Sequence, residues 1–119
     1  VILDIHRDSM ITSTGVKYRP ITSIGGKTAA QIMLVVGTPQ NGKQHDGWHD
    51  NLRFAMALQK ILTDNYPGLM RPINLRADRF NQHLRPGAIL IEVGSCGNSL
   101  GEAEYAAELF ASGLAQLLK

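Results

Sequence analysis

The sequence predicts an α/β fold in which a β-sheet is flanked by helices. Three observations predict it: short runs of branched apolar residues that are typical of buried strands, two longer segments with helical periodicity, and the alternation of these along the chain. With 119 residues, 44% of them hydrophobic and 18% charged, the chain has the size and composition of one globular domain. We therefore treat residues 1–119 as a single domain.

The predicted sheet is built from apolar runs that end in polar or glycine residues. The first is Val1–Ile5, the second Ala29–Val36 and the third Ala88–Val93, and a shorter strand is predicted at Pro72–Leu75. Between the first two runs, β-branched residues recur around glycines over residues 11–24, which predicts a short hairpin excursion. Polar side chains that could take part in binding or catalysis are thus expected where the first and third strands end.

Two segments are predicted to be helices that cover the sheet. Apolar residues recur at helical spacing from Trp48 to Tyr66, and a Pro-Gly pair ends the pattern. A second helix is predicted over Ala103–Leu118. Ser99 and Glu102 fit a capping box at its start, in which each side chain satisfies a backbone donor of the other residue.

Composition excludes several classes of function. The net charge of +2 is small and the basic residues are scattered, so nucleic acids are not expected partners. The longest apolar runs fall far short of the roughly 20 residues that cross a bilayer. Cys96 is the single cysteine and cannot form an internal disulfide. Because the chain enters a strand directly at Val1, we expect it to be an excised piece of a longer protein.

His6 and Glu92 are the strongest candidates for chemistry, because each lies at the end of an apolar strand. In α/β sheets ligands bind at the carboxyl ends of strands, so the imidazole and the carboxylate would converge if the two strands are neighbours. A metal-bound water activated by a carboxylate is the chemistry of zinc hydrolases. The alternative is that His6 is a hydrogen-bonded edge histidine and Glu92 a solvated acid.

Three weaker patterns point elsewhere. His45 and His49 have the spacing of a zincin motif with Asp in place of Glu, but Gly47 disfavours the helix this requires, which favours a polar entry to the following helix. Gly26-Lys27-Thr28 resembles the end of a phosphate-binding loop that lacks its first glycine. Cys96 is a candidate nucleophile with His6 as its base, although isolated cysteines are more often inert.

An ordered set of motifs across almost the whole chain resembles the stage II sporulation protein P family. The segments that carry the resemblance are Asp4 to Ser9, Tyr66 to Arg71, Phe80 to Leu84, Leu90 to Gly94, and Asn98 to Leu100. The resemblance implies that residues 1–119 are the C-terminal part of a zinc amidase catalytic domain, built on an amidase-like mixed sheet flanked by helices. It also implies the activity of an N-acetylmuramoyl-L-alanine amidase, a zinc enzyme that cuts peptidoglycan between muramic acid and the first alanine of the peptide stem.

By motif, His6 matches a histidine ligand of the zinc and Glu92 the catalytic glutamate of that family. Family members are also credited with endopeptidase activity on peptide cross-links. The resemblance further implies membrane anchoring outside the cytoplasm, and action with stage II sporulation proteins D and M during forespore engulfment. The alternative from another class of function is a module that binds peptidoglycan or acts as a scaffold without catalysis.

The chain departs from the family pattern in its metal ligands. The other two, a histidine and a glutamate, are expected before Asp4, so this piece should bind zinc weakly, hydrolyse little alone and self-associate through its bared sheet edge. Arg7, Arg71 and Asn81 are predicted substrate contacts, the last two for a stem carboxylate or a sugar amide. Phe80 stands where the family more usually has tyrosine.

Overall fold

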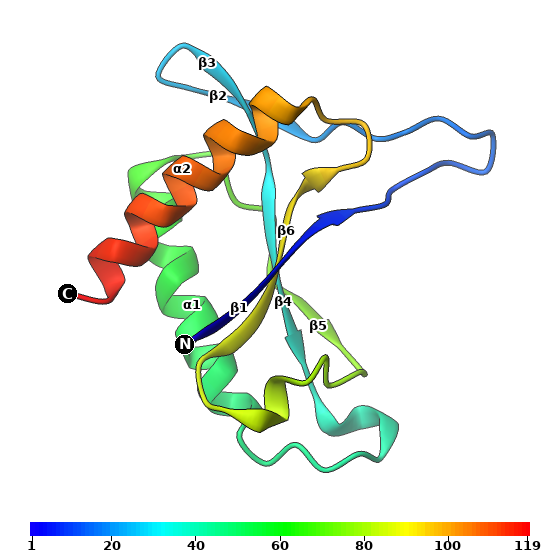
Figure 1. The fold of residues 1–119 in the computed structure, drawn as a ribbon, viewed down its shortest axis with the longest axis vertical. Coiled ribbons are helices and arrows are strands. Elements are labelled where there is room, and N and C mark those ends of the chain that lie inside the picture. Colours follow the sequence, from blue (N-terminus) through cyan, green and yellow to red (C-terminus); the bar gives the residue numbers. More distant parts are fainter.

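The computed structural model describes all residues from 1 to 119 and contains a mixed four-stranded sheet, a separate hairpin and two long helices (Figure 1). The strands are β1 (Ile2–Asp8), β2 (Ile21–Ile24), β3 (Lys27–Ala30), β4 (Ile32–Gly37), β5 (Asn74–Arg76) and β6 (Ala88–Ser95). The helices are α1 (Trp48–Asn65) and α2 (Leu100–Leu117), and short 3-10 turns are η1 (Pro39–Asn41) and η2 (Gln82–Leu84). The predicted α/β fold is confirmed.

The main sheet has the strand order β1-β6-β4-β5. β1 runs parallel to β6, β4 runs antiparallel to β6, and β5 runs parallel to β4, so the sheet is mixed as the resemblance implied. Between β1 and β4 in the chain, β2 and β3 form a separate antiparallel hairpin, which confirms an excursion after the first strand but ends it later than the predicted residues 11–24. Figure 1 shows the segment after β1 projecting away from the sheet before it returns as β2.

The predicted strand Ala29–Val36 is wrong as a single element. Its first residues belong to β3 of the hairpin and the rest to β4 of the main sheet, with a break at Gln31. There the backbone N–H of Gln31 donates to the Pro20 carbonyl at 3.0 Å, and its carbonyl accepts from Gly94 N–H at 3.0 Å. The chain changes sheets at this residue, a choice of partners that a continuous apolar run does not reveal.

Both helices cover the same face of the main sheet, and this face contains the core (Figure 1). Leu58 and Leu62 of α1 and Phe110 of α2 pack against every second residue of the central strands, because alternate strand residues point to one face. The core residues of the sheet are Ile32, Leu34, Val36, Ile89, Ile91 and Val93. Neither α1 nor α2 covers the opposite face (Figure 1). Neither helix combines the length and the apolar character that a membrane span requires.

The start of α2 is the predicted capping box, extended by an ion pair. Ser99 Oγ accepts from Glu102 N–H at 3.2 Å and the Glu102 carboxylate accepts from Ser99 N–H at 3.1 Å. That buried carboxylate also pairs with Arg19, which precedes the hairpin, and accepts from Asn98 at 2.9 Å. The bonds from Arg19 and Asn98 lower the pKa of Glu102 to about 2, although burial opposes the shift and Ser99 N–H adds to it.

This carboxylate makes part of the stability pH-dependent. Because its folded pKa of about 2 lies below its ordinary value of 4.5, the contribution is complete above pH 4.5 and is lost as pH falls toward 2. We expect Glu102→Gln to lower the free energy of unfolding at neutral pH, and the difference from wild type to shrink as pH falls through this window. Urea unfolding across the window measures it. Glu104→Gln, at an exposed site on the same helix, is the control, and a pH-independent difference would contradict the assignment.

Strand β1 lies at the edge of the main sheet and has one neighbour, β6. Ile5 of this strand is 66% exposed and Leu100 of α2 is 69% exposed, and both line an apolar groove between strand and helix. A free strand edge beside apolar surface is a template for pairing with another chain. We propose that the isolated 119-residue chain self-associates through this edge, so Ile5→Lys should shift its light-scattering mass toward the monomer. A strictly monomeric wild-type chain would contradict this.

Candidate functional site

The candidate site lies on the open face of the sheet, where the strands β1 and β6 run side by side. His6 pairs in register with Glu92, and Asp4 pairs with Leu90 two residues earlier. Because Ile89, Ile91 and Val93 point into the core, the alternation of side chains turns Leu90 and Glu92 to the opposite face. The strands of His6 and Glu92 are thus neighbours, which is the condition under which the sequence pattern brings the two side chains together.

The location of this pair along the strands differs from the prediction. The sequence pattern puts His6 just beyond the end of its strand, but β1 continues to Asp8 because its parallel pairing with β6 extends through His6 and Glu92. The register then shifts between His6 and Asp8. The polar side chains of β1 thus stand on the sheet surface itself.

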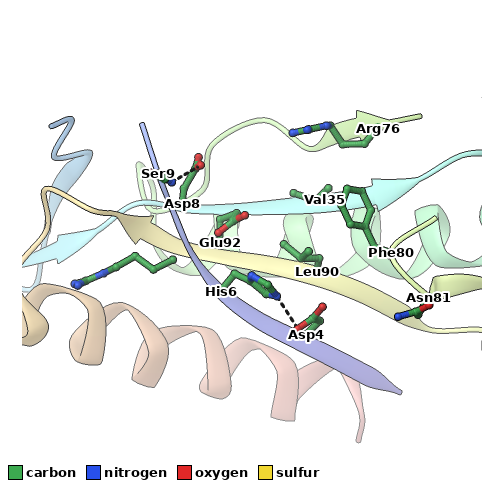
Figure 2. Close-up of a pocket in the computed structure, with 11 residues that line it drawn as sticks. Asp4, His6, Asp8, Ser9, Val35, Arg76, Phe80, Asn81, Leu90 and Glu92 are labelled. Carbon is green, nitrogen blue, oxygen red and sulfur yellow. Dashed lines mark hydrogen bonds and ion pairs between the residues drawn. The ribbon is translucent and has the colours of Figure 1, made fainter. Parts of the chain in front are cut away.

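A cavity of about 500 Å³ occupies this open face (Figure 2). Its floor includes the buried side chains of Val35 and Leu90, and its walls carry charged and polar groups from β1, β5, β6 and the segment before η2. The lining residues are Asp4, His6, Arg7, Asp8, Ser9, Val35, Arg76, Phe80, Asn81, Leu90 and Glu92. Only three of these residues are hydrophobic, so polar and charged groups converge over an apolar floor and the cavity suits a polar ligand.

Glu92 is the most unusual polar group in this cavity. Its Oε2 is buried and has no hydrogen-bond partner within the chain. Burial raises the pKa of Glu92 above its usual value, and the neighbouring Asp8 raises it further, while His6, Arg71 and Arg76 oppose the shift. A raised pKa and a free oxygen suit a carboxylate that exchanges protons with a bound molecule.

The imidazole of His6 is held by Asp4 on the same strand. The distance from His6 Nε2 to Asp4 Oδ1 is 2.8 Å, and both side chains are about half exposed. Since Asp4 and His6 are two residues apart on a strand, their side chains share one face (Figure 2). This contact fixes one ring nitrogen and leaves Nδ1 without a protein partner.

The residues of this chain do not form a complete zinc site. Catalytic zinc takes three protein ligands, usually histidines or carboxylates. Nowhere in the chain does a group of three or more His, Cys, Asp or Glu side chains lie together in a metal-binding arrangement. His6 can provide one metal ligand, and its ring is held by the Asp4 carboxylate. Glu92 lies next to His6, but the two residues together do not provide the three ligands that zinc needs.

A strained segment brings Phe80 and Asn81 to the cavity. Both have positive φ, 51° and 60°, a conformation that asparagine tolerates and that is rare for phenylalanine. The next residue, Gln82, is buried and pins the segment to β4: its Oε1 accepts from Gly37 N–H at 2.8 Å and its Nε2 donates to the Val35 carbonyl at 3.1 Å. Such strain is typical of functional sites.

Two of the three residues predicted to contact the substrate line the cavity, and the third does not. Asn81 lines it. Arg7 also lines it, but its guanidinium donates to the carbonyls of Asn98 and Ser99 at 2.9 and 3.1 Å, which ties β1 to the start of α2. Arg71 is not a lining residue. It stands behind Asp8, with its Nη1 3.5 Å from Asp8 Oδ2.

The three weaker patterns do not form sites of the kinds considered. His45 precedes α1 and only His49 is in the helix, so the two do not share a helical face. Gly26 lies in the turn of the β2–β3 hairpin, and Lys27 and Thr28 begin β3, with no helix directly after them. The thiol of Cys96 has polar contacts with Ser95 Oγ and the Met10 carbonyl, and none with a histidine.

Sequence reasoning missed Asp4 and Arg76. The alternation of Asp4, His6 and Asp8 was a usable signal, because residues two apart on a strand share a face. Arg76 ends the short strand β5 and lines the cavity across β4, which only the strand order reveals. Gln82 lies in a polar segment that predicts a solvent-exposed loop, yet its side chain is buried.

Comparison with known proteins agrees with the resemblance found in the motifs. The sequence model of the family Stage II sporulation protein P (SpoIIP) matches residues 1–115. Stage II sporulation protein P of Bacillus subtilis (strain 168) is 32% identical over 111 residues, which cover 89% of this chain and 25% of the relative. The chain thus spans a quarter of the length of that relative. No solved structure matches it. The extent of the family match and the identity to this relative show that the chain belongs to the stage II sporulation protein P family.

Proposed function

We propose that this chain carries the general base and one metal ligand of a zinc-dependent N-acetylmuramoyl-L-alanine amidase that hydrolyses peptidoglycan during forespore engulfment. Membership of a sporulation-protein family supports the biological setting. The observation that carries the chemical proposal is the buried, unpartnered oxygen of Glu92 beside His6, at the floor of a cavity. The choice of the bond that is cut rests on the motif resemblance alone.

Glu92 is the residue that moves the proton in this proposal. Its carboxylate accepts a proton from the attacking water and delivers it to the nitrogen of the leaving amine. Burial raises its pKa, which brings the group nearer to the pH at which a base and its conjugate acid are both available. Asp4 holds the ring of His6 through Nε2 and leaves Nδ1 available for a ligand.

The cavity walls suit a peptide attached to a sugar. Val35, Leu90 and Phe80 offer apolar surface, while Arg76 offers a cation for a stem carboxylate and Asn81 an amide for a peptide or N-acetyl group. Arg71 acts through Asp8 in this proposal, by holding that carboxylate at the cavity edge. These contacts position the scissile amide over Glu92.

The rest of the zinc site belongs, in this proposal, to a segment that precedes the chain in the longer protein. This chain provides one histidine, so we assign no catalytic step to the metal. Membrane anchoring outside the cytoplasm and action with stage II sporulation proteins D and M are likewise proposed for the longer protein, on the motif resemblance alone.

Digestion of purified peptidoglycan by the longer protein tests the function. Mass spectrometry of the products should show free stem peptides that begin with L-alanine, and His6→Ala should abolish their release while His49→Ala, at an exposed histidine of α1, should not. Products cut only within the cross-links would assign endopeptidase activity instead of amidase activity. Full hydrolysis by the His6→Ala protein would overturn the site.

The second candidate function is non-catalytic binding of peptidoglycan by the isolated chain. The incomplete ligand set favours it for these 119 residues alone. In a cell-wall pull-down the isolated chain should then be retained without releasing stem peptides. Stem-peptide release by this chain alone would contradict the proposed division of ligands.

A further inference from the structure

A second polar cavity lies away from the proposed catalytic site, between the loop before α1 and the segment before η2. Its volume is about 240 Å³, and none of its lining residues is hydrophobic: Gln44, His45, Asp46, Gly47, Arg79 and His83. It shares no residue with the larger cavity. The proposed hydrolysis uses none of these side chains.

His45 is the residue that indicates a ligand, because its polar ring atoms lack partners. The side chain is 1% exposed, and both of its ring nitrogens are buried without a hydrogen-bond partner. Buried polar groups in folded proteins nearly always have partners. Burial lowers the pKa of His45, as do the charges of His83 and Arg79, while Asp46 opposes this. The neutral ring carries a lone pair, the form in which histidine binds metals.

His83 is the second imidazole at this cavity. Its ring centroid lies 6.4 Å from that of His45 and the ring planes are nearly perpendicular, at 85°. Two imidazoles that bind one ion at about 2.1 Å have their centroids roughly 5 to 6 Å apart. Because His83 is exposed, a shift of its side chain by about 1 Å would bring both rings within that range.

We propose that His45 and His83 together bind a divalent transition-metal ion such as Zn²⁺, with water completing the coordination and Asp46 lining the site. Imidazole ligands favour this class of ion. Arg79 lines the same cavity, but its Nη1 donates to the Gln44 carbonyl at 3.0 Å, which turns the guanidinium toward the backbone. With two protein ligands, the affinity should be lower than that of a closed zinc site.

Such an ion would add a link between two loops that the bond from Arg79 to the Gln44 carbonyl already joins. His45 belongs to the loop after η1, and His83 lies in η2, directly after the strained residues Phe80 and Asn81 of the catalytic cavity. The bound ion would hold the segment that supplies those residues. Its role is therefore to stabilise one wall of the proposed substrate site.

Zinc titration of the chain in a His6→Ala background tests the site, because that background removes the proposed catalytic ligand. Three of the four histidines then remain, and their ring signals in NMR spectra are read separately. The His45 and His83 signals should shift together, and zinc should raise the melting temperature. His83→Asn should lower zinc affinity at least tenfold, and the matched exposed variant His49→Asn should change it less than twofold.

Equal zinc affinity with and without His83, or zinc shifts confined to His49, would overturn the proposal. Inorganic phosphate is the competing probe: shifts of His45 and His83 by phosphate but not by zinc would assign an anion site instead. Because these readouts are independent of hydrolysis, failure here leaves the proposed amidase intact. Absence of hydrolysis in the longer protein would equally leave this site standing.

Discussion

Glu92→Gln should reduce peptidoglycan hydrolysis by the longer protein by at least about 100-fold, since a positioned general base contributes roughly 10² to 10⁴ in rate. The substitution keeps the shape of the side chain and removes its ability to take a proton. The loss should fall on kcat, measured as the rate of stem-peptide release. Glu104→Gln, at an exposed glutamate of α2, is the matched control and should remain within twofold of wild type.

The same variant should not lose stability. The folded pKa of Glu92 is raised by burial, so ionising this carboxylate costs folding free energy as pH rises from its ordinary pKa through the raised one. A neutral glutamine avoids the cost, and the variant should be at least as stable as wild type at neutral pH. Low activity together with lost stability in the Glu92→Gln protein would point to misfolding, and full activity would remove Glu92 from the mechanism.

Asn51→Ala should lower the free energy of unfolding by about 3 kcal/mol or more, because it strips partners from buried backbone groups that cost about 1 to 3 kcal/mol each when unsatisfied. Asn51 Oδ1 accepts from the N–H groups of Gly87 and Ala88 at 2.8 and 3.1 Å. Its Nδ2 donates to the Gln82 carbonyl at 3.0 Å, and the side chain is fully buried. One amide thus joins α1, η2 and the start of β6.

Urea denaturation measures this loss. Asn65→Ala is the matched control, since Asn65 is exposed at the other end of α1 and bonds only the side chain of Gln116. It should change stability by less than about 0.5 kcal/mol. Equal effects of the two variants would show that the buried amide contributes no more than an exposed one.

The predictions from periodicity were confirmed where the local pattern and the packing agree. The helix from Trp48 and the capped helix after Ser99 were found close to their expected bounds, because their apolar stripes and the capping box are local signals. The prediction of one strand over Ala29–Val36 was wrong, because hydrogen bonding at Gln31 divides this run between two sheets. Periodicity carries no information on which strand is the partner.

The sequence by itself determined the α/β class, the two helices, and His6 and Glu92 as candidate residues for chemistry, since each depends on residue types at short spacing or on strand ends that the apolar runs mark. Only the tertiary structure showed that the strands of His6 and Glu92 are neighbours. Only the tertiary structure decided that both helices cover one face and leave the other open for a cavity. It also decided that Arg76 reaches this cavity and that His45 lies buried beside His83. These contacts join residues far apart in the chain, and strand order and burial create them.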